Sequence, residues 1–372
     1  MLGPFRRDRV APASRFAAVS GVPAAPAVPA APAVPAASCG PAAPAAPVAA
    51  ARGSAASLAA RELGAASAAV LALALLAATP AVAVAPPLAD PRIVAHFDIA
   101  RGLKPENIAA EPGGSAVLTF SLARQVGRVD RHGRFTVLAT LPAPEHPSTP
   151  VIGAAVVSGL ARAHDGTLYF TYATGTADLT GLWRLRPGGG PERIAAFPPA
   201  GLPNGLALDE RAGVLYSADS VLGVVRVVPV DGGEPEVWSA DARLKPVTTF
   251  GANGLKVHGG AVWVGNTDLG SLLRIPIGTD GAAGPVEVRA EGLEGLDDFA
   301  FVGRGDDLIA ALDTPSQAVH LGPDGIRRTV LDASDGLSNP SSVAVRGDSV
   351  YVPSAAFLTM VDPNLLVARL ER

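Results

Sequence analysis

The feature that most constrains the fold of this chain is a short unit that recurs along it. The clearest copy begins at Asn204 and consists of a polar residue, a glycine, a strand with leucine at positions 206 and 208, a glycine turn, and a second strand that ends at Asp219. Alternation of large apolar residues with smaller ones is the period-2 pattern of a β-strand. A second close copy begins at Asn253. The sequence therefore indicates a chain built from repeats of one β unit.

Looser copies bring the number of repeats to six. The apolar residue two places after the first polar position marks each copy: Ile108, Leu160, Leu206, Leu255, Phe299 and Val343. Successive marks lie from 44 (255 to 299) to 52 (108 to 160) residues apart, which is typical of the blades of a β-propeller. One blade cannot bury both faces of its sheet, so the copies must pack around a common axis. The sequence predicts an all-β, six-bladed β-propeller of four-stranded blades over residues 92–372, closed by an N-terminal strand at Arg92–Ile99 that joins the last blade.

Composition excludes several classes of protein. The 372 residues carry a net charge of −4, which excludes a nucleic-acid binder that depends on bulk positive charge. The single cysteine, Cys39, excludes an internal disulfide framework and a cysteine-based metal site. The partner expected for such a chain is a small-molecule substrate.

Two segments precede the repeats. Residues 1–64 are rich in alanine and proline and contain too little large apolar surface to offset chain entropy, so we expect a disordered leader. Residues 65–85 contain the apolar run Ala68–Ala78, followed by small residues that suit cleavage after Ala83 or Ala85. This pattern indicates a signal peptide, with a retained membrane anchor as the alternative. The sequence therefore predicts a secreted or periplasmic protein, attached to a membrane only if this segment is not cleaved.

The polar residues that open the innermost strands are the candidate site. Because each copy starts its first strand at the same phase, these side chains should converge on the axis at one mouth of the channel: Glu106, Ser158, Asn204, Asn253, Asp297 and Ser341. They offer only oxygen donors, which suit a divalent cation, first Ca²⁺ and otherwise Zn²⁺, Mg²⁺ or Mn²⁺. Two carboxylates in a narrow channel are costly unless a cation pairs with them or one is protonated.

Turn chemistry is the alternative interpretation of these residues. Asn-Gly is a common turn dipeptide, so Asn204 and Asn253 could simply cap the starts of strands. Four aspartates near strand ends are also expected to bind turn amides rather than a metal: Asp209, Asp219, Asp268 and Asp313. The mixed identities along the ring favour the metal. Among the histidines, only His146 lies in a loop, Leu141–Pro150, that could overhang the mouth as a catalytic base.

Four short motifs carry a resemblance to a known family. They are Pro105-Glu106-Asn107, Leu202-Pro203-Asn204-Gly205, Ala252-Asn253-Gly254-Leu255 and Leu296-Asp297-Asp298. In this order and spacing, the chain from about residue 92 to its end resembles the senescence-marker-protein/gluconolactonase (regucalcin-like) family of six-bladed propellers. The resemblance implies an axial divalent metal held by Glu106, Asn253 and Asp297. It also implies lactone hydrolysis, with Asp297 as metal ligand and general base.

The remaining ring residues, and two differences from the pattern of this family, bear on the identity of the substrate. The resemblance places Asn204 near the metal or substrate, and we assign Ser158 and Ser341 to substrate binding with it. Leu202 stands where sugar lactonases of this family place an arginine for hydroxyl recognition, which argues against a sugar. Asp298 stands where the family usually has glycine after the acidic ligand.

The sequence thus supports a first hypothesis and two alternatives. The first is an exported, metal-dependent hydrolase of the lactonase type that opens a lactone or related ester. One alternative is a non-catalytic propeller that presents a binding surface, because units such as Tyr216–Ser220 also occur in repeat propellers of that kind. The other is a scaffold resembling strictosidine-synthase-like propellers, with different chemistry at the same mouth.

Overall fold

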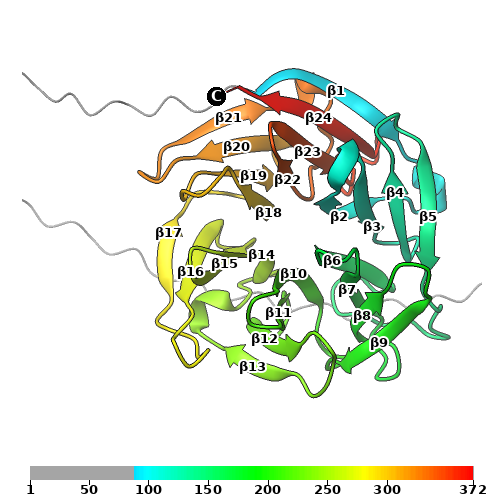
Figure 1. Ribbon diagram of the computed structural model, residues 1–372, viewed down its shortest axis with the longest axis vertical. Coiled ribbons are helices and arrows are strands. Elements are labelled where there is room, and N and C mark those ends of the chain that lie inside the picture. Colours follow the sequence, from blue (N-terminus) through cyan, green and yellow to red (C-terminus); the bar gives the residue numbers. More distant parts are fainter. Residues whose placement is uncertain (1–87, 372) are drawn as a thin grey trace, which may run out of the picture. The chain divides into compact units, whose positions relative to one another are not determined.

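The computed structural model describes residues 88–371, which form a six-bladed β-propeller of four-stranded antiparallel blades (Figure 1). This confirms the fold predicted from the repeats. In the first five blades the strands pair in chain order, so each blade is a meander that begins next to the axis and ends at the rim. The predicted leader and signal segments, 1–64 and 65–85, lie outside the described residues.

The strands of these five blades follow the predicted hairpins closely. Blades one and two consist of β2 (Pro105–Ala110), β3 (Ala116–Phe120), β4 (Gln125–Val129), β5 (Phe135–Thr140), β6 (Val156–Arg162), β7 (Leu168–Ala173), β8 (Gly181–Leu185) and β9 (Pro191–Ala196). Blades three to five consist of β10 (Pro203–Asp209), β11 (Val214–Asp219), β12 (Val224–Pro229), β13 (Glu236–Ser239), β14 (Ala252–His258), β15 (Ala261–Asn266), β16 (Ser271–Pro276), β17 (Glu287–Ala290), β18 (Leu296–Phe301), β19 (Leu308–Leu312), β20 (Gln317–Leu321) and β21 (Arg327–Leu331).

The sixth blade closes the ring with the N-terminal strand, as predicted. It is formed by β22 (Ala344–Arg346), β23 (Ser349–Ser354), β24 (Asn364–Leu370) and β1 (Leu88–His96). Strand β1 pairs antiparallel with β24, so both ends of the described chain meet in one sheet (Figure 1). The strand begins earlier than predicted and ends at His96 rather than Ile99, because Asp98 accepts a hydrogen bond from the amide of Ala100 and caps a short helix there.

Helical structure is minor in the described part of the chain. It consists of four single-turn 3-10 helices: η1 (Ile99–Arg101), η2 (Pro112–Gly114), η3 (Ala242–Leu244) and η4 (Ala333–Asp335). Within residues 88–371, no helix is long and apolar enough to cross a membrane.

Apolar packing between neighbouring blades forms the core. One buried cluster fills each of the six interfaces; the interface between blades one and two, for example, contains Val117, Phe170 and Trp183. Phe170 in blade two and Phe299 in blade five are fully buried. Replacing such a phenylalanine by alanine typically costs about 3–5 kcal/mol, so the blades hold one another in register through these contacts.

Candidate functional site

A β-bulge sets the direction of each predicted ring residue in the first five blades. The ladder between the two innermost strands slips at the ring position, for example between Pro105 and Asn107 around Glu106, and between Leu296 and Asp298 around Asp297. The same slip occurs in blades two, three and four. A bulge turns a side chain away from the regular pleat. The same bulge therefore directs the ring residue in each of these five blades.

The Asn-Gly pairs lie inside strands, not in turns. Gly205 and Gly254 belong to β10 and β14 and do not have the positive φ of a hairpin turn. A Cβ on Gly205 would lie 2.2 Å from the carbonyl oxygen of Asn253, and one on Gly254 would lie 2.4 Å from that of Asp297. The glycines therefore allow the ring residue of the next blade to approach closely, which corrects the turn interpretation.

Hydroxyl side chains fasten neighbouring blades beside the ring. In five of the six interfaces, a serine or threonine of one blade donates a hydrogen bond to a backbone oxygen at or next to a ring residue of the next blade: Thr119 to Ser158, Thr171 to Asn204, Ser220 to Ala252, Thr267 to Leu296, and Ser341 to Pro105. These bonds are 2.6–2.9 Å long. They fix the ring positions relative to one another.

Five of the six predicted residues line a single cavity of about 500 Å³: Glu106, Ser158, Asn204, Asn253 and Asp297. The convergence expected from the repeats is therefore present for these five. Ser341 is the exception. It is buried, and its hydroxyl donates to the carbonyl of Pro105 rather than lining the cavity. In the sixth copy, β22 begins only at Ala344, so Ser341 precedes the strand and links the last blade to the first.

The carboxylates of the cavity are unfavourably placed as anions. Burial, together with the charges of Asp313 and Asp298, raises the pKa of Glu106 to about 8. Burial and then the charge of Glu106 raise the pKa of Asp297 well above its usual range. Glu106 Oε2 is buried and has no hydrogen-bond partner. Such groups gain stability either from protons or from a bound cation.

Asn253 links this pair to the blade junction. Its Nδ2 donates to Asp297 Oδ1 at 2.8 Å and to Thr267 Oγ1 at 2.9 Å. Both bonds use amide protons, which leaves the Asn253 carbonyl oxygen as the atom available to a cation. The Thr267 hydroxyl donates in turn to Leu296 at 2.8 Å. The orientation of Asn253 is therefore fixed by two neighbours.

Asp313 is a further acidic residue of the cavity and lies outside the ring predicted from the repeats. It follows β19, lines the cavity, and has a pKa raised by burial. Ser121 and Thr267 occupy the matching place in their blades and line the cavity too. The signal for its place in the cavity is a second aligned column about 15 residues after the ring. The prediction that Asp313 binds a turn is also confirmed, because it accepts hydrogen bonds from the hydroxyl and the backbone amide of Thr314.

The other three aspartates also accept hydrogen bonds from backbone amides, as predicted. Asp219 accepts hydrogen bonds from three backbone amides and pairs with Arg226 at 3.0 Å. Asp268 accepts from the four amides of residues 247–250, and Asp209 from that of Ala212. His146 does not line the cavity; its side chain is 89% exposed beside Glu145.

The donor set fits a hard cation that uses an amide oxygen as well as carboxylates. Among residues 88–371, no group of three or more His, Cys, Asp or Glu side chains is arranged to hold a metal ion by itself. Glu106 and Asp297 supply carboxylate oxygens, one of them without a partner, and Asn253 supplies a neutral oxygen. This is the oxygen chemistry of Ca²⁺ or Mg²⁺ sites.

Asp298 plays a different part from its neighbour. It is 1% exposed, and its carboxylate accepts hydrogen bonds from Lys256 Nζ at 2.5 and 2.7 Å, from Asn107 at 3.0 Å and from Ser342 at 2.6 Å. Lys256 therefore neutralises its charge within the channel, and donors from three other blades hold the carboxylate in place. Asp298 stands where the family that this chain resembles usually has glycine. Here it links four blades through its hydrogen bonds.

Apolar residues form the rest of the cavity walls. Val151 and Ile152 come from the loop after Pro150, and Phe357 and Leu358 come from the loop between β23 and β24. The first pair continues the Leu141–Pro150 loop that was expected to lean over one face. Leu122, Val156, Leu202 and Phe250 complete the apolar part of the lining.

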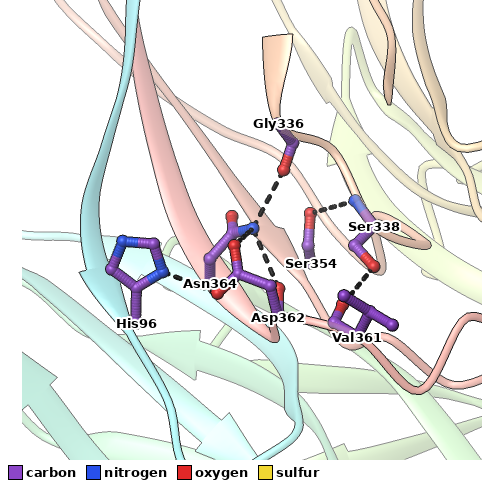
Figure 2. Close-up of polar contacts among 7 residues, drawn as sticks. All are labelled: His96, Gly336, Ser338, Ser354, Val361, Asp362 and Asn364. Atoms are coloured by element: carbon purple, nitrogen blue, oxygen red, sulfur yellow. Dashed lines mark hydrogen bonds and ion pairs between the residues drawn. The ribbon is translucent and has the colours of Figure 1, made fainter. Parts of the chain in front are cut away.

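The second wall loop is anchored by polar contacts at its base (Figure 2). Asp362 lies 2.6 Å from His96 of β1, and Ser338 donates to the carbonyl of Val361. Asn364 Nδ2 donates to the carbonyls of Gly336 and Asp362. The loop that carries Phe357 and Leu358 is therefore fastened to the closing blade.

Comparison with known proteins identifies the fold. No family profile matches the sequence, and no curated protein is recognisably similar to it. Solved structures similar to this chain include regucalcin, a calcium-binding protein, from Agrobacterium tumefaciens (19% identity, TM-score 0.55, covering 76% of this chain and 95% of that one). They also include a gluconolactonase from Xanthomonas campestris (17%, 0.53, 78% and 99%) and virginiamycin B lyase from Staphylococcus aureus (12%, 0.51, 76% and 98%). The chain thus shares its propeller fold with gluconolactonase and regucalcin, as its motifs predicted.

Proposed function

We propose that this protein is a cation-dependent hydrolase of the lactonase type. The observation that carries the proposal is the pair of buried carboxylates, Glu106 and Asp297, that face one cavity with raised pKa values and an unpartnered oxygen. Leaving such groups without a cation or a proton is unfavourable, and proteins retain them where they serve a site. The fold shared with a calcium-binding regucalcin and a gluconolactonase supports the same class.

The residues of the cavity have distinct roles in this proposal. Glu106, Asn253 and Asp297 would hold the cation, which when bound supplies Lewis-acid polarisation of the carbonyl oxygen. Asp297 accepts a proton from the attacking water. Asn253 keeps Asp297 in place through the 2.8 Å hydrogen bond. Asn204 and Ser158 lie in the same cavity, where they can donate hydrogen bonds to the substrate.

A pH-stat assay of the purified full-length chain tests the proposal. A panel of lactones and aryl esters is offered with Ca²⁺, Mg²⁺, Mn²⁺ or Zn²⁺, and again after chelation. We expect hydrolysis that is lost on chelation and restored by one cation, with Ca²⁺ as the first candidate. Turnover that is unaffected by chelator, or the absence of turnover in protein with a bound cation, would reject the proposal. The second of these results would favour a non-catalytic propeller.

We also propose that the protein acts outside the cytoplasm. The basis is the sequence pattern of residues 65–85, which resembles a signal peptide. N-terminal sequencing of the native product tests this. A start near Val84 or Pro86 agrees with export, whereas an intact Met1 contradicts it.

A further inference from the structure

We infer that the substrate carries a neutral hydrocarbon substituent, such as the alkyl chain of a substituted lactone, which packs against the apolar residues of the cavity. That the substrate is a lactone rests on the proposed function. That it carries a hydrocarbon substituent is deduced from the lining of the cavity alone. Beside the polar side chains of the ring, the cavity is lined by eight apolar residues: Leu122, Val151, Ile152, Val156, Leu202, Phe250, Phe357 and Leu358. Its volume of about 500 Å³ suits a small organic molecule.

The charge of the lining restricts the substrate further. None of the described lining residues is Lys, Arg or His, and the only charged ones are the acidic Glu106, Asp297 and Asp313. A phosphate or carboxylate on the substrate would find no cationic side chain there to pair with it. The apolar walls also offer no side-chain donors or acceptors for several sugar hydroxyls. The lining therefore favours a neutral substrate that carries a hydrocarbon group.

The apolar side chains at the mouth are unusually exposed. Val151, Ile152 and Leu358 are 59, 41 and 63% exposed. Large exposed apolar side chains gathered around one opening mark a ligand site more often than single scattered ones do. They come from two loops that lie far apart in the sequence. The fold brings both loops to one cavity.

Both loops are built to hold these side chains in place. Val151 adopts φ +69°, a strained left-handed conformation for a β-branched residue, and such strain is found mainly at functional sites. In the other loop, Asn339 Oδ1 accepts hydrogen bonds from the amides of Leu358 and Thr359 at 2.9 and 2.8 Å. The buried Lys104 donates to the carbonyl of Ala356 and lies 5.3 Å from the ring centre of Phe357. The walls are therefore preformed.

A chain-length series tests the inference. kcat/KM is measured for γ-lactones with unbranched alkyl substituents of zero, two, four and six carbons, with glucono-δ-lactone as the polar comparator. Each added methylene should raise kcat/KM about three- to fourfold until the walls are covered. Equal rates along the series, or preference for the sugar lactone, would overturn the inference and leave the proposed hydrolysis standing.

Binding separates this inference from the proposed function. The Kd of γ-lactams with the same substituents, which are not readily hydrolysed, is measured by calorimetry on the full chain. Tighter binding with each methylene supports the apolar site even if no lactone is opened, in which case only the proposed hydrolysis fails. A Kd independent of chain length overturns the inference whatever the activity.

A matched pair of variants locates the effect. Leu358→Ser should reduce the advantage of the six-carbon over the unsubstituted compound about three- to tenfold, in rate or in Kd. The control is Val237→Ser, which replaces a similarly exposed residue (58%) on the outer strand of blade three and lies away from the cavity. It should leave the chain-length advantage unchanged. Equal losses in both variants would contradict the assignment of the walls.

Discussion

Asn253 Nδ2 lies 2.8 Å from Asp297 Oδ1, so the ring residues of blades four and five are joined directly across the blade interface. The hydrogen bond favours the ionised form of Asp297, whereas burial and Glu106 oppose it. Burial and Glu106 together outweigh the hydrogen bond from Asn253, so the ionised form of Asp297 is destabilised. A bound cation would therefore stabilise the ionised carboxylate of Asp297.

Replacing Asp297 should separate activity from stability. Asp297→Asn keeps the size of the side chain but removes its charge and its basicity, so we expect hydrolysis to fall about 10²–10³-fold. Because a repulsive carboxylate is lost, the cation-free variant should melt about 2–5 °C above cation-free wild type. Calorimetry with and without Ca²⁺ measures this. Asp231→Asn, at an outer turn, is the control and should change neither quantity.

The stability of the cation-free protein should fall as pH rises. The pKa of Glu106 is raised to about 8 from an ordinary value of 4.5, so the folded state holds a proton that the unfolded chain has released. The resulting stabilisation is complete below about pH 4.5 and is lost as pH rises toward 8, by an amount on the order of a few kcal/mol. Urea titrations between pH 5 and 8.5 measure it.

Two controls define this pH effect. Glu106→Gln removes one titrating group and should weaken the dependence, whereas Asp297 and Asp313, whose pKa values are also raised, keep part of it. Saturating Ca²⁺ should do the same in wild type, because the cation replaces the proton as the partner of the carboxylate. A pH dependence that is identical in wild type and Glu106→Gln would contradict the assignment to Glu106.

Removing Lys256 should destabilise the channel. Lys256→Met leaves Asp298 buried with only the neutral donors Asn107 and Ser342, and breaking such a buried pair typically costs about 3–5 kcal/mol. Urea denaturation measures the loss. Arg369→Met, which breaks an exposed ion pair with Asp90, should leave the midpoint nearly unchanged. Restoration of stability in the double variant Lys256→Met/Asp298→Asn would confirm that the uncompensated charge is the cause.

The glycines behind the ring should be intolerant of a side chain. In Gly205→Ala the new Cβ would meet the Asn253 carbonyl at 2.2 Å, so blades three and four must separate. We expect a loss of about 1–3 kcal/mol of stability and weaker cation binding, because Asn253 shifts. Gly190→Ala is the control: it has open space around it and a φ that alanine accepts, and it should be neutral. Thermal unfolding and Ca²⁺ calorimetry distinguish the two variants.

The sequence by itself determined the number of blades, the strands and five of the ring residues. The reason is that these depend on local information: a repeat period, alternation of apolar residues within a few positions, and the phase of each copy. Because every copy starts its inner strand alike, Glu106, Asn204 and Asp297 meet without any further signal. Closure by the N-terminal strand also follows, since an unpaired strand next to an incomplete sixth blade has one edge to join.

Only the tertiary structure decided the residues that depend on contacts between blades and loops. Asp313 and Asp268 both follow second strands near turns in the sequence, yet one faces the cavity and the other accepts four amides. Ser341 matches the ring in sequence but binds Pro105 at the junction of the last and first blades. The apolar residues Val151, Ile152, Phe357 and Leu358 come from two loops outside the aligned strands, and these loops meet only when the ring closes. Such contacts join positions far apart in the chain, where no local pattern specifies the partner.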